Sequence, residues 1–127
     1  MIIAGRGAVQ ADAKDAIEAF AQRVGGLFAT SYRGIGYFSG HPYSIEFVGT
    51  WGTPLSNSYL IESDLVFAVG CSLNQHMTDW GRLVDEATIV HVDTDPAAIN
   101  RHIPVDLGLV GDAEATVEAL TEEIERR

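Results

Sequence analysis

The sequence has a single cysteine, only four prolines, few basic residues and no long hydrophobic run. Cys71 cannot form a disulfide within the chain, so a disulfide-stapled secreted domain is excluded. No stretch approaches the roughly 18 consecutive apolar residues of a membrane-spanning helix, and Met1–Ala4 is too short for a signal peptide. Eight Lys and Arg against eighteen Asp and Glu give a net charge of −10, which repels nucleic acid and anionic lipid. We therefore expect a cytoplasmic protein that has neither of those partners.

The length and composition are those of one folded domain. A chain of 127 residues is long enough to bury about two thirds of its unfolded surface around a single core. A hydrophobic content of 46% with 20% charged residues separates it from disordered chains. We therefore treat residues 1–127 as a single domain.

Short apolar runs alternate with segments of helical periodicity. We expect strands at residues 2–4, 27–30, 45–48, 65–69, 88–92 and 107–110. We expect helices at residues 13–24, from Pro54 to about Glu62, at residues 97–100 and after Asp112, with residues 31–46 forming a loop lined by aromatic residues and residues 75–87 irregular or briefly helical. This alternation predicts an α/β fold, a Rossmann-like open six-stranded parallel sheet with helices on both faces.

In such sheets, ligands bind beside the carboxyl ends of the strands, near the point where the strand order reverses. Glycine turns at those ends expose backbone N–H groups that can cradle a pyrophosphate, and carboxylates there can accept hydrogen bonds from ribose hydroxyls. A dinucleotide or an ADP-like ligand fits this pattern. The candidate binding residues follow five of the expected strands: Gly5, Arg6, Gly7, Gly49, Thr50, Trp51, Gly52, Gly70, Ser72, Asp93, Thr94 and Asp112.

A purely structural role for these glycines is an equally good alternative, because any α/β sheet needs glycines at its turns. Gly5 and Gly7 are expected to allow a positive φ and a close backbone approach. Gln10 occupies the place of the third glycine in the dinucleotide fingerprint, so a standard NAD site is disfavoured. Arg6 either holds a phosphate or is simply solvated.

The sequence offers few candidates for a catalytic residue. Cys71 has no His or Cys within a few positions, and His91 lies in an apolar strand where a core role is expected. Asp93 and Asp95 could hold a cation, but ribose binding or helix capping is the simpler interpretation. We predict no catalytic residue and no metal site, since the four histidines lack metal-ligand spacing: His41, His76, His91 and His102.

Taken in order, the turns carry a family resemblance. The motifs are Ile3-Ala4-Gly5-Arg6-Gly7-Ala8, His41-Pro42, Gly49-Thr50-Trp51-Gly52-Thr53-Pro54 with Asn57, Asp64-Leu65-Val66 with Val69-Gly70, His91-Val92-Asp93-Thr94-Asp95-Pro96 and Gly111-Asp112-Ala113. Over nearly its whole length the chain resembles the central domain of thiamine-diphosphate-dependent enzymes of the acetolactate synthase, pyruvate oxidase and benzoylformate decarboxylase superfamily. The fold implied is of the deoxyhypusine-synthase-like NAD/FAD-binding type.

The resemblance implies that residues 1–127 come from a longer chain and normally lie between a pyrimidine-binding and a diphosphate-binding domain, both absent here. The start of the sequence inside an expected strand fits this interpretation. The parent is expected to use thiamine diphosphate and magnesium as a lyase or transferase on a 2-oxo acid or aldehyde, and to form a dimer or tetramer. Because the family's catalytic glutamate and metal ligands belong to the absent domains, this domain alone is expected to be non-catalytic.

Family members differ in whether this domain binds FAD, ADP, the adenine of coenzyme A or nothing. Arg6 stands at the middle glycine of the family's first turn, where it could block or anchor a pyrophosphate. Ser72 stands where flavin-binding members have an arginine, which argues against FAD. Asp93, Asp95 and Asp112 fall where other members contact adenosine. We favour a vestigial site over an occupied one.

Two other functions stay open. One is a self-standing nucleotide-binding regulatory module, because the fold also resembles the NAD domains of sirtuins and deoxyhypusine synthase, although one cysteine excludes the sirtuin zinc module. The other is a protein-interaction module, favoured if the aromatic residues of the loop form an exposed patch. Those residues are Tyr32, Tyr37, Phe38, Tyr43 and Trp51.

Overall fold

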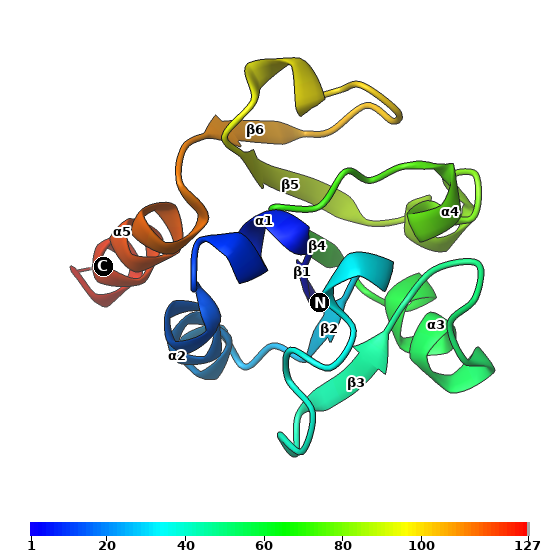
Figure 1. Ribbon diagram of the computed structural model, residues 1–127, viewed down its shortest axis with the longest axis horizontal. Coiled ribbons are helices and arrows are strands. Elements are labelled where there is room, and N and C mark those ends of the chain that lie inside the picture. Colours follow the sequence, from blue (N-terminus) through cyan, green and yellow to red (C-terminus); the bar gives the residue numbers. More distant parts are fainter. Residues whose placement is uncertain (127) are drawn as a thin grey trace.

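The computed structural model describes residues 1–126 (Figure 1). In this part of the chain six parallel strands form one sheet, in the order β3-β2-β1-β4-β5-β6. The Rossmann-like α/β fold with six strands is therefore confirmed. The strands are β1 (Ile2–Ala4), β2 (Phe28–Thr30), β3 (Ser44–Phe47), β4 (Leu65–Val69), β5 (Thr88–Asp93) and β6 (Leu107–Val110).

Helices cover both faces of the sheet and enclose two hydrophobic cores. Alternate residues of each strand point to opposite faces, so Ile2 and Ala4 enter one core and Ile3 enters the other. The first core lies under α1 (Arg6–Gln10), α2 (Lys14–Val24) and α5 (Ala113–Arg126). The second lies under α3 (Pro54–Ile61), α4 (Gln75–Thr78) and the 3₁₀ turn η2 (Arg82–Val84). Figure 1 shows α2 and α5 on one side and α3 and α4 on the other.

The helix ends follow local sequence signals. Thr53 caps α3, since its Oγ1 accepts a hydrogen bond from the N–H of Ser56 at 3.0 Å, and Pro54 occupies the first helical position. Gly25 ends α2 with a φ of 67°. Asp112 begins α5 in the expected way, because its Oδ2 accepts from the N–H of Ala115 at 3.0 Å.

The turn after β1 differs from the expectation. Gly5 has a φ of −110° and Gly7 lies in α1, a short helix that the sequence did not predict, so the expected positive φ is wrong. The expected close approach is confirmed, however. A Cβ on Gly5 would lie 2.4 Å from the Cβ of Cys71, and one on Gly7 would lie 2.9 Å from the Cα of Gly70. These glycines are needed for packing against the end of β4.

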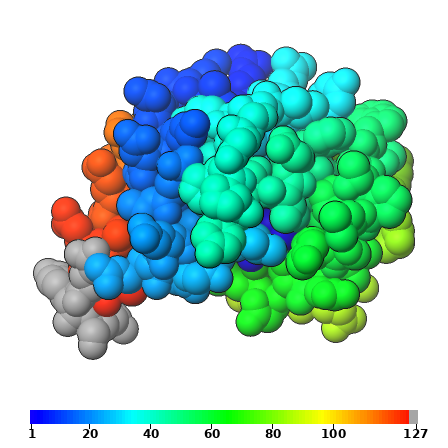
Figure 2. Space-filling view, turned by 90° about the horizontal axis from the view of Figure 1, so that it is seen from below, coloured from blue at the N-terminus to red at the C-terminus, as the bar shows by residue number. Residues whose placement is uncertain are grey.

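One other segment differs in detail, because the helix expected at residues 97–100 is a 3₁₀ turn, η3 (Pro96–Ala98). Residues 75–87 contain the short helix α4 and the 3₁₀ turn η2, which agrees with the expectation of an irregular or briefly helical segment. In the aromatic loop, which includes the 3₁₀ turn η1 (Tyr32–Gly34), Phe38 is buried against Phe28 with 4.6 Å between ring centroids, whereas Tyr32 and Tyr43 are exposed. Figure 2 shows this loop, in cyan, on the surface between α2 and the green region of α3.

Among residues 1–126, none of the helices has the length and apolar composition that crossing a bilayer requires. The chain's first residue is tied to the sheet, because the amino group of Met1 donates to the carbonyl oxygen of Leu65 at 2.8 Å.

Candidate functional site

Two cavities adjoin at the carboxyl ends of the strands. The larger, which we name the edge cleft, has a volume of about 420 Å³ and includes Arg6, Gly7, Gly70, Ser72, Asp93 and Thr94 in its lining. The smaller, which we name the aromatic pocket, has a volume of about 150 Å³ and includes Gly49, Thr50, Trp51 and Ser72. The remaining sequence-predicted residues, Gly5, Gly52 and Asp112, line neither cavity. The fold thus brings nine of the twelve candidates to one edge, next to the β1–β4 switch point.

The backbone N–H groups of the first turns are used inside the protein. Gly5 donates to the carbonyl oxygen of Val69 at 2.9 Å, and Gly7 donates to that of Gly70 at 2.8 Å. Gly70 in turn donates to the carbonyl oxygen of Val92 at 2.9 Å. Each glycine therefore ties one strand end to the next, and these donors are not presented to the cleft.

The turn after β3 is closed in the same way. The side-chain amide of Asn57 accepts from the N–H of Gly49 at 3.1 Å and donates to its carbonyl oxygen at 2.8 Å. Thr50 donates to the carbonyl oxygen of His76 at 2.7 Å, and Gly52 donates to that of Gly49 at 2.9 Å. Three of the four N–H groups that this turn was expected to offer a phosphate are therefore engaged.

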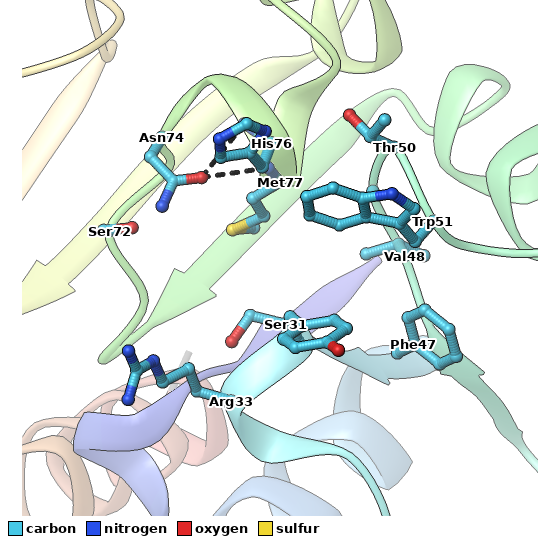
Figure 3. Close-up of a pocket in the computed structure, with 12 residues that line it drawn as sticks. Ser31, Arg33, Phe47, Val48, Thr50, Trp51, Ser72, Asn74, His76 and Met77 are labelled. Carbon is cyan, nitrogen blue, oxygen red and sulfur yellow. Dashed lines mark hydrogen bonds between the residues drawn. The ribbon is translucent and has the colours of Figure 1, made fainter.

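Side chains of the protein itself narrow the aromatic pocket. The indole of Trp51 stacks on the imidazole of His76, with 5.0 Å between ring centroids and 28° between planes, and Tyr32 lies 5.7 Å from Trp51. Figure 3 shows Trp51 and His76 next to each other on one side of the pocket, with Arg33 on the opposite side. The volume is below the roughly 300–1,000 Å³ of small-molecule sites.

The acidic candidates cap turns and a helix. Asp93 Oδ1 accepts from the N–H of Asp95, and Asp95 Oδ1 accepts from the N–H of Ala97, both at 2.9 Å. Asp112 caps α5, as described above. Within residues 1–126, no group of His, Cys, Asp and Glu side chains is arranged to hold a metal ion. Capping is therefore confirmed for Asp95 and Asp112, and ribose binding by Asp93 and Asp95 stays a prediction.

Three exposed arginines line the edge cleft, and the sequence analysis identified only Arg6 among them. Arg33 and Ser31 follow β2, so the strand-end rule, applied also to that strand, would have found both. Asn74 lies two residues beyond Ser72 in the same turn after β4, so the strand-end rule could have found it too. Arg101 follows η3 in an irregular segment, where no sequence pattern predicts a position at the cleft.

Cys71, which is in the lining of the edge cleft, and His91 are both buried. His91 Nε2 lies 2.7 Å from the carbonyl oxygen of Cys71 and 3.9 Å from Oδ2 of Asp93, while its Nδ1 has no hydrogen-bond partner among the described residues. Burial lowers the pKa of His91, and burial raises the pKa of the Cys71 thiol to about 12. Neither group is therefore suited to general-base or nucleophilic chemistry at neutral pH.

Comparisons with known proteins agree with the fold. Residues 1–120 match the family described as "Thiamine pyrophosphate enzyme, central domain". The chain is 32% identical over 128 residues to the acetolactate synthase large subunit of Buchnera aphidicola subsp. Schizaphis graminum, covering 99% of this chain and 22% of that protein. It is 33% identical over 122 residues to the probable acetolactate synthase large subunit of Methanocaldococcus jannaschii, covering 94% and 21%. It is 32% identical over 124 residues to the acetolactate synthase large subunit of Corynebacterium glutamicum, covering 96% of this chain and 20% of that protein.

The chain thus spans about a fifth of the length of these curated relatives. The family match extends over nearly the whole chain and includes all six strands and the first half of α5. The chain therefore belongs to the family of thiamine pyrophosphate enzyme central domains.

Proposed function

We propose that this chain is the non-catalytic central domain of a thiamine-diphosphate-dependent enzyme of the acetolactate synthase type, which acts on a 2-oxo acid. The match of residues 1–120 to the family carries this proposal, and relatives named as acetolactate synthase large subunits support it. Thiamine diphosphate, when bound in the parent, supplies an electron sink for carbanion chemistry. The groups that hold it and its magnesium belong to the other domains.

We also propose that the edge cleft is a vestigial nucleotide-binding site, one that no longer holds a nucleotide. The observation that supports it is the engagement of the glycine-turn N–H groups by Val69, Gly70 and Val92. A pyrophosphate needs such donors to be free and convergent. The engagement of these donors and the small volume of the aromatic pocket both support a cleft that does not hold FAD.

A self-standing nucleotide-binding module is less well supported, for the same reason. Its site would need the donors that Gly5, Gly7 and Gly49 give to the protein's own acceptors. The structural role of these glycines accounts for their positions without a ligand.

The enzymatic part of the proposal is tested with the complete polypeptide that contains this chain. We expect it to consume pyruvate only when thiamine diphosphate and magnesium are both added, and we expect the 127-residue chain alone to be inactive. A complete polypeptide without any such activity towards 2-oxo acids or aldehydes would overturn the proposed reaction class.

The vestigial site is tested by an absorbance spectrum and mass analysis of the purified chain, then by thermal unfolding with FAD, ADP, NAD or coenzyme A. We expect no flavin absorbance, no copurified nucleotide and no increase in the unfolding temperature. Stoichiometric flavin or adenine nucleotide would show that the cleft is an occupied site.

A further inference from the structure

Helix α3 has an uncharged surface on its outer side. None of its eight residues is charged. Ser56 and Leu60 face the core, whereas Leu55, Tyr59 and Ile61 are 67%, 43% and 45% exposed. Large apolar side chains exposed on a surface without charge are typical of interaction sites. The outer surface of α3 therefore has the composition of a contact surface.

The helices on the opposite face of the sheet, α2 and α5, differ from α3 because they have charged residues on their outer sides. The outward positions of α2 include the exposed charged residues Asp15 and Arg23, and those of α5 include Glu118 and Glu122. That layer has the amphipathic pattern of a helix that borders water. The two helical layers thus differ in composition, because α2 and α5 have exposed charged residues and α3 has none.

A strained turn places a tryptophan on the same side. Trp80 is 80% exposed, and its φ of 58° stands between those of Asp79 at 47° and Gly81 at 85°. The conformation is fixed by hydrogen bonds at 2.9 Å from the N–H of Trp80 to the carbonyl oxygen of Gln75 and from the N–H of Gly81 to Oγ1 of Thr78. Such strain persists where the surroundings enforce it, and here it holds an indole in water.

The turn and the helix belong to one surface. Residues Arg82–Val84 of η2, directly after the turn, pack against α3. We name the exposed side chains Leu55, Tyr59, Ile61 and Trp80 the α3 face. Exposed acids follow α3 and η2 along the chain: Glu62, Asp64, Asp85 and Glu86. The N–H of Thr88 donates to the carbonyl oxygen of Asp64, which brings these two acidic segments together.

We propose that the α3 face is the docking surface for another part of the same polypeptide, one that presents an apolar patch with a basic rim. This inference rests on the proposed function, because it requires a chain longer than the 127 residues described. The curated relatives are about five times as long as their match to this chain, so chains of that organisation have the additional polypeptide. A second copy is a poorer occupant, since each copy has a net charge of −10 and acids border the face.

The test is hydrogen exchange of the complete polypeptide compared with that of the 127-residue chain. We expect amides of residues 54–61 and 79–84 to exchange at least about tenfold more slowly in the complete polypeptide. Amides in the middle of α2 and α5 provide an internal reference and are expected to change little. Equal exchange of residues 54–61 in the two proteins would overturn the proposal.

Charge substitutions test the same surface. Leu55→Glu and Tyr59→Glu in the complete polypeptide are expected to abolish the added protection. The matched control is Ala19→Glu, which places a carboxylate at an exposed position of α2 and is expected to leave the protection intact. All three variants of the short chain are expected to unfold at the same denaturant concentration as the parent, because the altered side chains are exposed. Protection that survives both α3 substitutions would contradict the proposal.

Two further measurements separate the alternatives. Sedimentation of the short chain detects self-association, and a dimer that Leu55→Glu dissociates would assign the face to a second copy instead. Activity with thiamine diphosphate, measured on the same complete polypeptide, tests the proposed function independently. Activity without protection overturns only the docking surface, whereas protection without activity supports the surface and contradicts the enzyme assignment.

Discussion

The imidazole Nε2 of His91 lies 2.7 Å from the carbonyl oxygen of Cys71, a contact between two buried residues that joins the end of β4 to the middle of β5. A carbonyl oxygen can only accept, so Nε2 holds the hydrogen of a neutral ring. The unpartnered Nδ1 would need a second buried proton for the ring to become charged. The folded protein therefore keeps His91 neutral, in agreement with the direction in which burial moves its pKa.

The stability of the chain should decrease as the pH falls through this histidine's titration. The pKa of His91 is lower in the folded than in the unfolded chain, so the unfolded chain binds the extra proton. The neutral His91 makes its full contribution to the free energy of unfolding at pH values above the pKa of the unfolded chain, near 6.5. This contribution is lost progressively as the pH falls from there to the pKa of the folded chain. The slope approaches about 1.4 kcal/mol per pH unit for one proton. Urea unfolding between pH 7 and pH 5 measures it.

His91→Gln is the control, because glutamine can still donate to the Cys71 carbonyl oxygen but does not titrate. We expect the variant to have a smaller slope over the same pH window. Parallel pH profiles for the two proteins would show that other groups cause the acid sensitivity.

Cys71 should be unreactive in the folded protein. Its thiol is buried, and burial raises its pKa to about 12, so the thiolate is rare at neutral pH. We expect a thiol reagent at pH 8 to label the native chain slowly, at a rate that follows the population of unfolded molecules, and to label the chain in urea at once. Rapid stoichiometric labelling without denaturant would contradict the buried environment.

Gly70 should be the least replaceable residue of the edge cleft. It has a φ of 61°, and a Cβ there would lie 2.4 Å from the backbone nitrogen of Ala8. Gly25→Ala is a matched control, since Gly25 has a φ of 67° with no atom within 4 Å of the added Cβ. We expect Gly25→Ala to cost about 1 kcal/mol for the left-handed backbone alone. Gly70→Ala should cost roughly 3 kcal/mol or more, because the steric clash adds to it. Equal losses in denaturant unfolding would contradict this account.

The sheet was predictable from the sequence because its signals are local. Buried parallel strands require short apolar runs such as Leu65–Val69, and these runs are bounded by glycines and polar residues. Helix α1 was missed for the opposite reason. Gly5 at its N-cap and Gly7 inside it have a low helix propensity. The helix forms because it packs against Gly70, which is far away in the sequence.

The position of the candidate site was also predictable, but its chemistry was not. The rule that ligands bind at strand ends points to the edge of the sheet where the edge cleft lies. Whether a glycine N–H faces a ligand depends on its acceptor, and the acceptor of Gly7 is the carbonyl oxygen of Gly70, 63 positions along the chain. No local pattern contains that information.

The strained turn leads to a prediction of a different kind, in which removing a large side chain does not destabilise the isolated chain. Trp80→Asn loses little packing, because the indole is almost fully exposed, and asparagine tolerates a positive φ better than tryptophan. We expect the free energy of unfolding to stay the same or to rise by up to about 1 kcal/mol. Trp51→Asn should instead destabilise the chain by roughly 0.5–1.5 kcal/mol, since Trp51 stacks on His76. A marked loss in Trp80→Asn would mean that the indole supports the fold rather than a contact surface.

Replacing Arg6 distinguishes a blocked nucleotide site from one that has lost its donors. If the Arg6 side chain were only an obstruction, Arg6→Gly would restore pyrophosphate binding and increase the affinity for ADP or FAD. The structure indicates otherwise, because the Arg6 side chain is exposed while the N–H groups of Gly5 and Gly7 are held by Val69 and Gly70. We therefore expect calorimetric titration of Arg6→Gly with ADP and with FAD to show no gain over the parent chain. A clear gain would mean that Arg6 is the obstruction and that the turn can still bind a phosphate.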